Sequence, residues 1–328
     1  MIDLTPVHGS TDSLPEPRYD FSSNANALGP CPPVLAAVRA ADVSRYPDPL
    51  YTRLRARLAQ WHGIEPDRIV VGAGASELIL RLVRHFDRTV LQLAPTFSEY
   101  GRGAGIARTR VVSVSSPDSF LRAQKRRRSL AFLCCPNNPT GDVWEPAFVA
   151  TAARQGPLVV DLAYAALCGS AQAADIEAAA ANAWRLYSPN KAFGMTGVRG
   201  AYLIAPRTAG RVADEAPSWV IGRDAVAMLE ACLEPAARAW LADSIPRLWR
   251  WRTRLAEGLR RLRLEVRESP ATFLLAEVGD GGRVGKRLRE AGIRVRDARS
   301  FGLERWIRVS AQPAPARKAL LTTLAQCL

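Results

Sequence analysis

The central part of the chain alternates short apolar segments with amphipathic ones, and this alternation constrains the fold more than any other feature. Between residues 68 and 205, seven segments are apolar and often β-branched, as strands buried on both faces are. Helical patterns lie between several of them, for example at 76–85 and 145–154. Such alternation is typical of an α/β fold with a mostly parallel sheet. We expect the strands at 68–72, 89–94, 109–114, 130–135, 157–161, 185–188 and 200–205.

The pattern changes after Pro206. A helix-rich stretch covers 223–263 and is expected to be interrupted near Pro235 and Pro246, because proline disrupts helix interiors. Short strands at 272–278 and 306–309 then accompany a helix at 283–291. We therefore expect a large domain at 41–215 and a smaller α+β domain at 216–328. Residues 1–40 are expected to form an N-terminal arm and part of the small domain.

The composition is ordinary for a globular protein, with 48% hydrophobic and 23% charged residues in 328. No apolar run reaches the roughly 18–20 residues that span a bilayer, and the N-terminus lacks a signal-peptide pattern. We therefore expect a cytoplasmic protein with no membrane partner. The six cysteines form no C-x-x-C pair and the three histidines are scattered, so we expect reduced thiols and no metal site.

The net charge of +14 is compatible with nucleic acid, an anionic membrane surface or anionic small substrates. The arginines are, however, spread along the whole chain, and the one dense basic run, at 125–128, lies between two expected strands. We interpret this run as a solvated turn. Because no nucleic-acid motif accompanies it, we expect no nucleic-acid partner.

One lysine lies where chemistry can use it, in the segment Ser188-Pro-Asn-Lys191-Ala-Phe-Gly194-Met-Thr-Gly197-Val-Arg199. Lys191 directly follows an apolar strand, where partial desolvation lowers the pKa of an amine and makes it a nucleophile. Arg199 has the planar fork that suits a phosphate, and Ser188 adds a hydroxyl. The alternative is a surface lysine in a structural loop.

A second segment, Gly72-Ala-Gly74-Ala75-Ser76, joins a strand to a helix. The free N–H groups at a helix start bind phosphate well. A dinucleotide-binding fingerprint, and hence an oxidoreductase, is the competing interpretation. It requires a third glycine where this chain has Glu77, which argues against it.

Two polar residues follow the next expected strands. Asp161 ends a buried strand, where an unpaired carboxylate would be costly. Asn138 lies in the turn Cys135-Pro-Asn-Asn-Pro-Thr-Gly141, whose prolines and glycine fix the direction of the amide.

Taken together, these segments resemble the fold-type I enzymes that depend on pyridoxal 5′-phosphate (PLP), the aspartate aminotransferase superfamily. S-x-x-K-x-x-G-x-x-G-x-R resembles the superfamily's cofactor-lysine motif, and the turn around Asn138 resembles its N-P-x-N-P-T-G turn. The resemblance extends from about residue 8 to the C-terminus. It implies a large domain with a seven-stranded, mostly parallel sheet, and PLP bound to Lys191 as a Schiff base.

The resemblance also assigns roles around the cofactor. Asp161 would pair with the pyridine nitrogen, which keeps the ring an electron sink. Asn138 and Tyr164 would bond its O3′, and Phe97 would stack on the ring. Lys191, Asp161 and Tyr164 are the expected catalytic residues. The residues expected to hold the cofactor phosphate are Gly74, Ala75, Ser76, Ser188 and Arg199.

Further matches concern the substrate and a second subunit. Tyr46, in Arg-Tyr-Pro-Asp-Pro, resembles a tyrosine that reaches the PLP phosphate of the neighbouring subunit, which implies a homodimer. Arg308, in Trp-Ile-Arg-Val, resembles the arginine that binds the substrate α-carboxylate. Asn26 and His8 are the other residues expected to bind substrate.

Residues 20–30, Asp-Phe-Ser-Ser-Asn-Ala-Asn-Ala-Leu-Gly-Pro, resemble the branch that contains histidinol-phosphate aminotransferase and L-threonine-O-3-phosphate decarboxylase, an enzyme of cobalamin biosynthesis. His8-Gly9 and the ending around Arg308 favour the decarboxylase. An aminotransferase for histidinol phosphate or another amino acid is the alternative. A non-catalytic, aminotransferase-like binding protein is a third possibility.

Overall fold

The computed structural model describes residues 14–126, 128–168, 170–207 and 210–328. All seven expected strands form one sheet in the order β2-β8-β7-β6-β5-β3-β4. Only β8 runs antiparallel to its neighbours, so the prediction of a mostly parallel seven-stranded sheet is confirmed. The strands are β2 (Ile69–Gly72), β3 (Thr89–Leu93), β4 (Val111–Val114), β5 (Ser129–Cys134), β6 (Leu158–Asp161), β7 (Trp184–Tyr187) and β8 (Ala201–Ile204).

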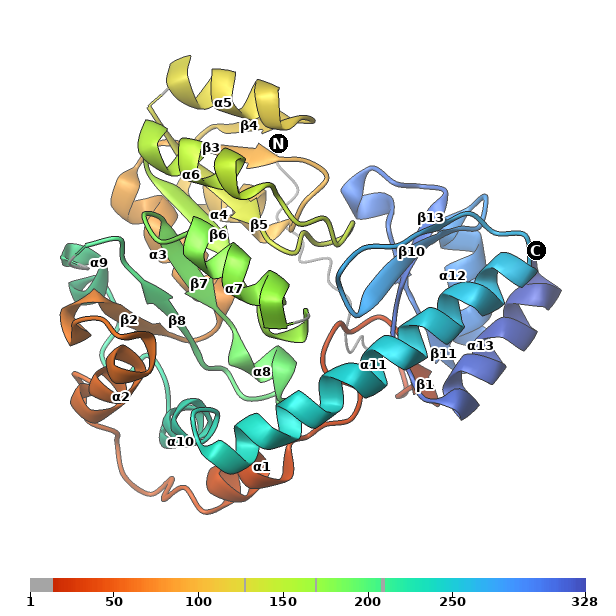
Figure 1. Ribbon diagram of the computed structural model, residues 1–328, viewed down its shortest axis with the longest axis horizontal. Coiled ribbons are helices and arrows are strands. Elements are labelled where there is room, and N and C mark those ends of the chain that lie inside the picture. The colour runs from red at the N-terminus through yellow and green to blue at the C-terminus, as the bar shows by residue number, and fades with distance from the viewer. Residues whose placement is uncertain (1–13, 127, 169, 208–209) are drawn as a thin grey trace.

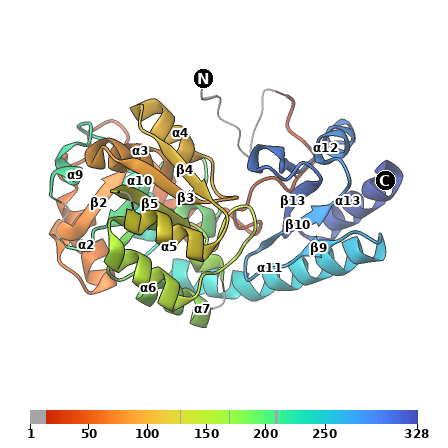
Figure 2. The same ribbon diagram turned by 90° about the horizontal axis from the view of Figure 1, so that it is seen from above.

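Helices cover both faces of this sheet (Figures 1 and 2). Alternate residues of β5 explain why: Leu130 and Phe132 pack with α3 and α4, whereas Ala131 and Leu133 pack with α5 and α6. Both faces are therefore buried, as the continuous apolar strands require. The helices of this domain are α2 (Thr52–His62), α3 (Ala75–Phe86), α4 (Glu99–Ala107), α5 (Pro117–Arg126), α6 (Pro146–Gln155), α7 (Ser170–Ala179), α8 (Pro189–Ala192) and α9 (Arg211–Asp214), with 3₁₀ turns η1 (Pro66–Arg68) and η2 (Ala165–Leu167).

The small domain has a four-stranded antiparallel sheet in the order β12-β13-β10-β9, covered by helices. The N-terminal arm joins it, because β1 (Tyr19–Asp20) pairs with β11 (Ile293–Arg294). The remaining elements are β9 (Val266–Arg267), β10 (Phe273–Glu277), α12 (Gly281–Glu290), β12 (Arg296–Asp297), η3 (Arg299–Phe301), β13 (Trp306–Ser310) and α13 (Ala314–Cys327).

One long helix, α11 (Pro235–Arg261), connects the domains, because its residues pack in the cores of both. The chain breaks between α10 (Arg223–Ala231) and α11, as expected at Pro235, but α11 continues through Pro246. The interruption expected there is wrong. Losing one hydrogen bond at proline costs about 3 kcal/mol, and burial of leucines on both sides of Pro246 offsets it. These are Leu241, Leu248, Leu255 and Leu259.

Two further helices pack against the large domain. α1 (Pro32–Arg39) and α10 share a hydrophobic core with β2 and β8 of the large sheet. The domain limits expected from the sequence stay a prediction.

The basic run at 125–128 differs in part from the expected turn, since Lys125 and Arg126 form the last residues of α5. Arg127 is outside the described residues. No described helix has the length and apolar character needed to cross a membrane.

Candidate active site

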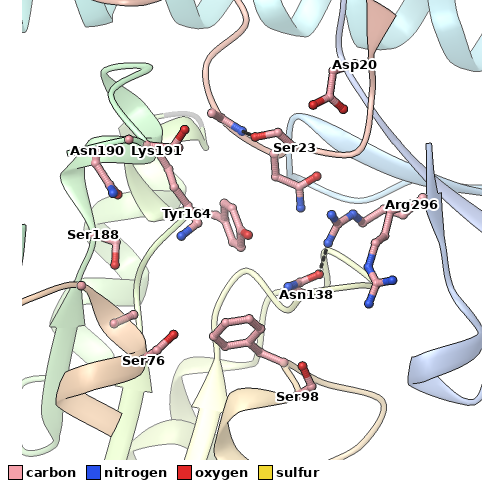
Figure 3. Close-up of a pocket in the computed structure, with 18 of the residues that line it drawn as sticks. Asp20, Ser23, Ser76, Ser98, Asn138, Tyr164, Ser188, Asn190, Lys191 and Arg296 are labelled. Carbon is pink, nitrogen blue, oxygen red and sulfur yellow. Dashed lines mark hydrogen bonds between the residues drawn. The ribbon is translucent and has the colours of Figure 1, made fainter. Parts of the chain in front are cut away.

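A cavity of about 590 Å³ lies between the two domains, at the carboxyl ends of β3, β5, β6 and β7. Figure 3 shows Lys191, Ser188 and Tyr164 on one side of it, with Asn138 and Arg296 opposite. Ligands of open α/β sheets bind at this end of the strands. The cavity brings together most of the site residues expected from the sequence, namely Gly74, Ala75, Ser76, Phe97, Asn138, Tyr164, Ser188, Lys191, Arg199 and Arg308.

Lys191 lies in the short helix α8, directly after β7. Its amine faces the cavity, 5.5 Å from the centre of the Tyr164 ring. Burial lowers the pKa of Lys191, while the nearby Asp161 raises it and Arg199 lowers it further. The net lowering makes the neutral, nucleophilic amine more accessible.

Asp161 is the last residue of β6, is buried, and is not among the residues that line the cavity. The Tyr100 hydroxyl donates to Asp161 Oδ2 (2.9 Å) and the Ala163 N–H donates to Oδ1 (3.0 Å). Burial raises the pKa of Asp161, and the positive charge of Lys191 lowers it in part. The buried carboxylate is therefore paired with donors, as burial requires.

One end of the cavity is built to bind an anion. Gly74 is the N-cap residue before α3, at φ +94°, and no described side chain caps the start of this helix. A Cβ at residue 74 would overlap the Arg199 guanidinium, so glycine allows the arginine to lie against the helix start. Ser188 lines the same cavity, and its buried Oγ has no hydrogen-bond partner among the described residues. A phosphate would satisfy all three groups.

In the turn after β5, the two adjacent asparagines Asn137 and Asn138 make different contacts. Asn137 holds the turn, since its amide donates to Pro95 O (2.9 Å) and Thr140 Oγ1 (2.8 Å). Asn138 instead faces the cavity, where its Oδ1 accepts a hydrogen bond from Arg308 Nη1.

The small domain contributes three buried arginines to the cavity: Arg294, Arg296 and Arg308. Arg296 and Arg308 lie directly opposite each other on β12 and β13. Arg308 Nη2 also donates to Ser22 O (2.7 Å), and burial lowers the pKa of Arg308 to about 10. Arg296 donates to Ser300 Oγ (2.6 Å). Arg294 donates to Asp20 Oδ2 at 3.0 Å.

Three expected site residues are elsewhere. Asn26 is not among the residues that line the cavity: its Nδ2 donates to Ala192 O (3.0 Å) and its Oδ1 accepts from Leu28 N (3.0 Å). The first bond holds the lysine loop and the second holds a turn of the N-terminal segment, so substrate binding by Asn26 stays a prediction. Tyr46 is 73% exposed and stacks on Trp219, away from this chain's cavity. His8 lies outside the described residues.

Sequence reasoning missed several cavity residues. The buried Asn24 faces the cavity instead of Asn26, and the shared asparagine motif could have indicated either. Arg294 and Arg296 are two positions apart in the sequence, at the end of β11 and the start of β12. Their i,i+2 spacing, at which side chains of an extended segment point the same way, was an available signal. Ser23, Ser98, Thr196 and Phe301 carried none.

Comparison with known proteins identifies the family. The chain matches the family described as aminotransferase class I and II over residues 17–326. The chain belongs to this family. It is therefore a PLP-dependent enzyme, as the resemblance implied.

Similar proteins agree with this assignment. A histidinol-phosphate aminotransferase from Haloferax volcanii is 33% identical, with 90% of this chain and 86% of the relative covered. Two solved structures share the fold at 24% identity. The PLP complex of histidinol-phosphate aminotransferase from Sinorhizobium meliloti has a TM-score of 0.85 (95% of this chain, 91% of that one). L-threonine-O-3-phosphate decarboxylase from Porphyromonas gingivalis has a TM-score of 0.82 (93% and 98%).

The residues of the cavity fit pyridoxal phosphate. The unpartnered Ser188 Oγ, the uncapped start of α3 and Arg199 form a phosphate site at one end. Lys191 provides an amine and Asp161 a buried carboxylate. Among the described residues, no cluster of three or more His, Cys, Asp or Glu side chains could hold a metal ion.

Proposed function

We propose that the chain is an aminotransferase of the histidinol-phosphate type, whose substrates carry a phosphate or a second acidic group. The observation that carries this proposal is the pair Arg296 and Arg308. Both residues are more than nine-tenths buried, line the cavity and lie opposite each other in the strand register. Like charges in such positions destabilise a sheet, and an anionic substrate offsets that repulsion. The Haloferax volcanii relative, which is similar over most of both chains, is named histidinol-phosphate aminotransferase and supports the proposal.

In this proposal the large domain manages protons and the cofactor. Bound PLP would supply an electron sink for the pair released at the substrate Cα. Lys191 would hold the cofactor covalently and carry the proton to and from that carbon. The negative charge of Asp161 would keep a proton on the ring nitrogen. Asn138 and Tyr164 would orient the ring through its O3′, and Phe97 would pack against it.

The small domain positions the substrate. Arg308 is held by Asn138 and by Ser22 O, two uncharged partners, so its positive charge is available to a carboxylate. Arg296, across the strand pair, is placed to bind a phosphate or a second carboxylate. Arg308 therefore links the substrate site to Asn138 on the cofactor side.

The test is a product assay on the PLP-loaded enzyme. We expect histidinol phosphate to react only when 2-oxoglutarate is supplied, with glutamate formed in equal amount. Histidinol without phosphate is the matched control and should react more slowly. Absence of glutamate with histidinol phosphate and with other amino donors would contradict an aminotransferase.

Threonine-phosphate decarboxylase, which the sequence favoured, becomes the second candidate because the comparisons support the aminotransferase better. One feature still favours it: threonine phosphate carries both a carboxylate and a phosphate, which match Arg308 and Arg296. Which bond breaks depends on how the substrate is rotated, and about 1.4 kcal/mol of positioning changes a rate tenfold. Carbon dioxide released from threonine phosphate without a keto acid would establish this candidate in place of the first.

We also propose that the enzyme works as a homodimer. Several large apolar side chains around Tyr46 are exposed, and contiguous exposed apolar patches are typical of interaction sites. They are Val43, Tyr46, Leu50 and Trp219. In a dimer Tyr46 would reach the partner's cofactor phosphate. Light scattering should give twice the mass of one chain, and Trp219→Glu should yield monomers. A cytoplasmic location stays a prediction.

A further inference from the structure

Arg294 is a third buried arginine of the active-site cavity, beyond Arg296 and Arg308. It is 6% exposed, ends β11 and lines the cavity, as Arg296 does two residues later. Figure 3 shows Asp20, to which Arg294 donates, on the same side of the cavity as Arg296 and opposite Lys191. A buried guanidinium keeps its charge and therefore needs anionic partners. Those partners decide what Arg294 can offer to a substrate.

One acidic partner of Arg294 is fixed. Arg294 Nη2 donates to Asp20 Oδ2 (3.0 Å), while Asp20 Oδ1 accepts from the N–H (2.7 Å) and the hydroxyl (2.6 Å) of Ser22. The backbones are paired as well, because Asp20 in β1 lies opposite Arg294 in β11. Both oxygens of the Asp20 carboxylate are therefore engaged, and the strand pairing holds the residue beside the arginine.

A second acidic partner, Glu16, is held loosely. Its Oε2 is 3.5 Å from Arg294 Nη2, which is longer than the roughly 2.7–3.2 Å of a normal N–H···O hydrogen bond. The side chain of Glu16 is 73% exposed, whereas that of Arg294 is 8% exposed. Ion pairs with an exposed partner contribute little, because water competes for the carboxylate. Glu16 also lines the cavity, so its carboxylate occupies a position that a substrate anion can take.

The backbone on both sides of Glu16 is anchored. Pro15 O accepts a hydrogen bond from Arg289 Nη2 (2.6 Å), and β1 begins soon after Glu16, at Tyr19. The N-terminal arm therefore does not have to move for the Glu16 carboxylate to leave Arg294. Rotation of one exposed side chain is enough, and such rotations are fast.

We propose that the Glu16 carboxylate is a placeholder for the distal anion of the substrate. When that anion enters, it displaces Glu16 and binds Arg294 together with Arg296, while Asp20 keeps its bond to Arg294. A phosphate displaces Glu16 readily, because it carries more negative charge than a carboxylate and has more acceptor oxygens. A substrate without a distal anion leaves Glu16 in place and gains nothing from Arg294. This selection rests on the proposed function, since it concerns the phosphate-bearing substrate of the same cavity.

The competing explanation is that Glu16 only neutralises a buried charge. Glu16→Gln would then lower the melting temperature and leave the binding of anions unchanged or weaker. A placeholder gives the opposite sign, because its removal strengthens the binding of an anion that competes with it. The direction of the change in one dissociation constant therefore separates the two explanations.

The experiment titrates 3-phosphonopropionate into the PLP-loaded enzyme by calorimetry. This compound carries a carboxylate for Arg308 and a phosphonate for Arg294 and Arg296, but it has no amine and so binds without reacting. We expect Glu16→Gln to bind it about two- to fivefold more tightly than the unaltered chain, which is the range of one exposed ion pair. Arg294→Gln should bind it about tenfold more weakly. Because no turnover is needed, a failure here is distinct from an absence of glutamate in the product assay.

Two further variants separate direct exchange from general charge repulsion. In Glu16→Gln with Arg294→Gln, loss of the Glu16 charge should have no additional effect, because the arginine for which the anions compete is gone. Glu290→Gln is the matched control: Glu290 is exposed at the end of α12, does not line the cavity, and its variant should bind the compound as the unaltered chain does. The proposal is overturned if Glu16→Gln binds the compound equally or more weakly, or if the gain persists without Arg294. It is also overturned if Glu290→Gln gives the same gain, or if no chain binds the compound in the millimolar range.

Discussion

The two sides of the active-site cavity differ in their charges: the large-domain side pairs opposite charges, and the small-domain side brings like charges together. On the large-domain side, the positive Lys191 lies near the negative Asp161. Lys191 lowers the pKa of Asp161 and Asp161 raises the pKa of Lys191, so each favours the charged form of the other. On the small-domain side, Arg296 and Arg308 face each other across a strand pair. Opposite charges keep the first side balanced without substrate, whereas the second side gains from an anion. Changes on the first should therefore affect turnover, and changes on the second should affect substrate affinity.

The largest effect is expected for Lys191→Ala on the large-domain side. Removal of the amine eliminates both covalent attachment and proton transfer, so turnover should fall at least about 10⁴-fold. The visible absorbance of attached cofactor should disappear. Lys286→Ala, an exposed lysine in α12, is the matched control and should leave both unchanged. Retained absorbance in Lys191→Ala would show that another residue holds the cofactor.

Asp161→Asn should lower kcat about 10²- to 10³-fold with a small change in KM, because the amide cannot hold the proton on the ring nitrogen by charge. Steady-state kinetics separate the two constants. Asp243→Asn, on the exposed face of α11, is the control. A rise in KM with kcat unchanged would contradict the proposal that Asp161 acts on the cofactor.

Arg308→Gln should raise KM for the anionic substrate about 30- to 100-fold, which is the loss of one or two charge-assisted hydrogen bonds. Cofactor absorbance should remain. Arg305→Gln, an exposed arginine three residues earlier, provides the comparison. If the variant loses its cofactor instead, the division between the two sides fails.

Arg296→Gln should have a smaller and more selective effect. We expect about a tenfold loss in kcat/KM for histidinol phosphate and almost none for histidinol, because only the first carries a phosphate. The ratio of the two substrates is the measurement, with Arg299→Gln as the control. Equal losses of kcat/KM for the two substrates would show that Arg296 maintains the structure and does not bind the substrate phosphate.

The smallest effect concerns pH. The neutral amine of Lys191 captures the aldehyde, so the rate of cofactor uptake by the apoenzyme rises with pH until that amine is deprotonated. Burial lowers the pKa of Lys191 and Asp161 raises it in part. Removing the Asp161 charge should therefore move the midpoint of the pH profile down, by about one unit. Stopped-flow absorbance measures it, and an upward shift would contradict the sign.

Much of this arrangement could be predicted from the sequence. The seven strands were predictable because most of their residues are apolar, and four of them, β2, β5, β6 and β8, are buried along their whole length. The cofactor residues follow directly after strands, so the order of the motifs located them. Asn138 could be separated from Asn137 only by the superfamily's turn.

Other features depend on tertiary packing that no local pattern contains. Pro246 normally ends a helix, but the leucines around it belong to two cores and keep α11 continuous. Asn24 and Asn26 are chemically identical, and only the approach of the lysine loop decides which one faces the cavity. The opposition of Arg296 and Arg308 required the strand register.

The continuity of α11 has a mechanical consequence. At about 1.5 Å per residue, its 27 residues make a rod about 40 Å long. Leu248 packs in the core of the large domain, and Leu255 and Leu259 pack in the core of the small one. Pro246 leaves one backbone carbonyl of the rod unbonded, so bending is easiest there. A small bend at that point would be amplified along the rod into a swing of the arginine-bearing sheet towards or away from Lys191.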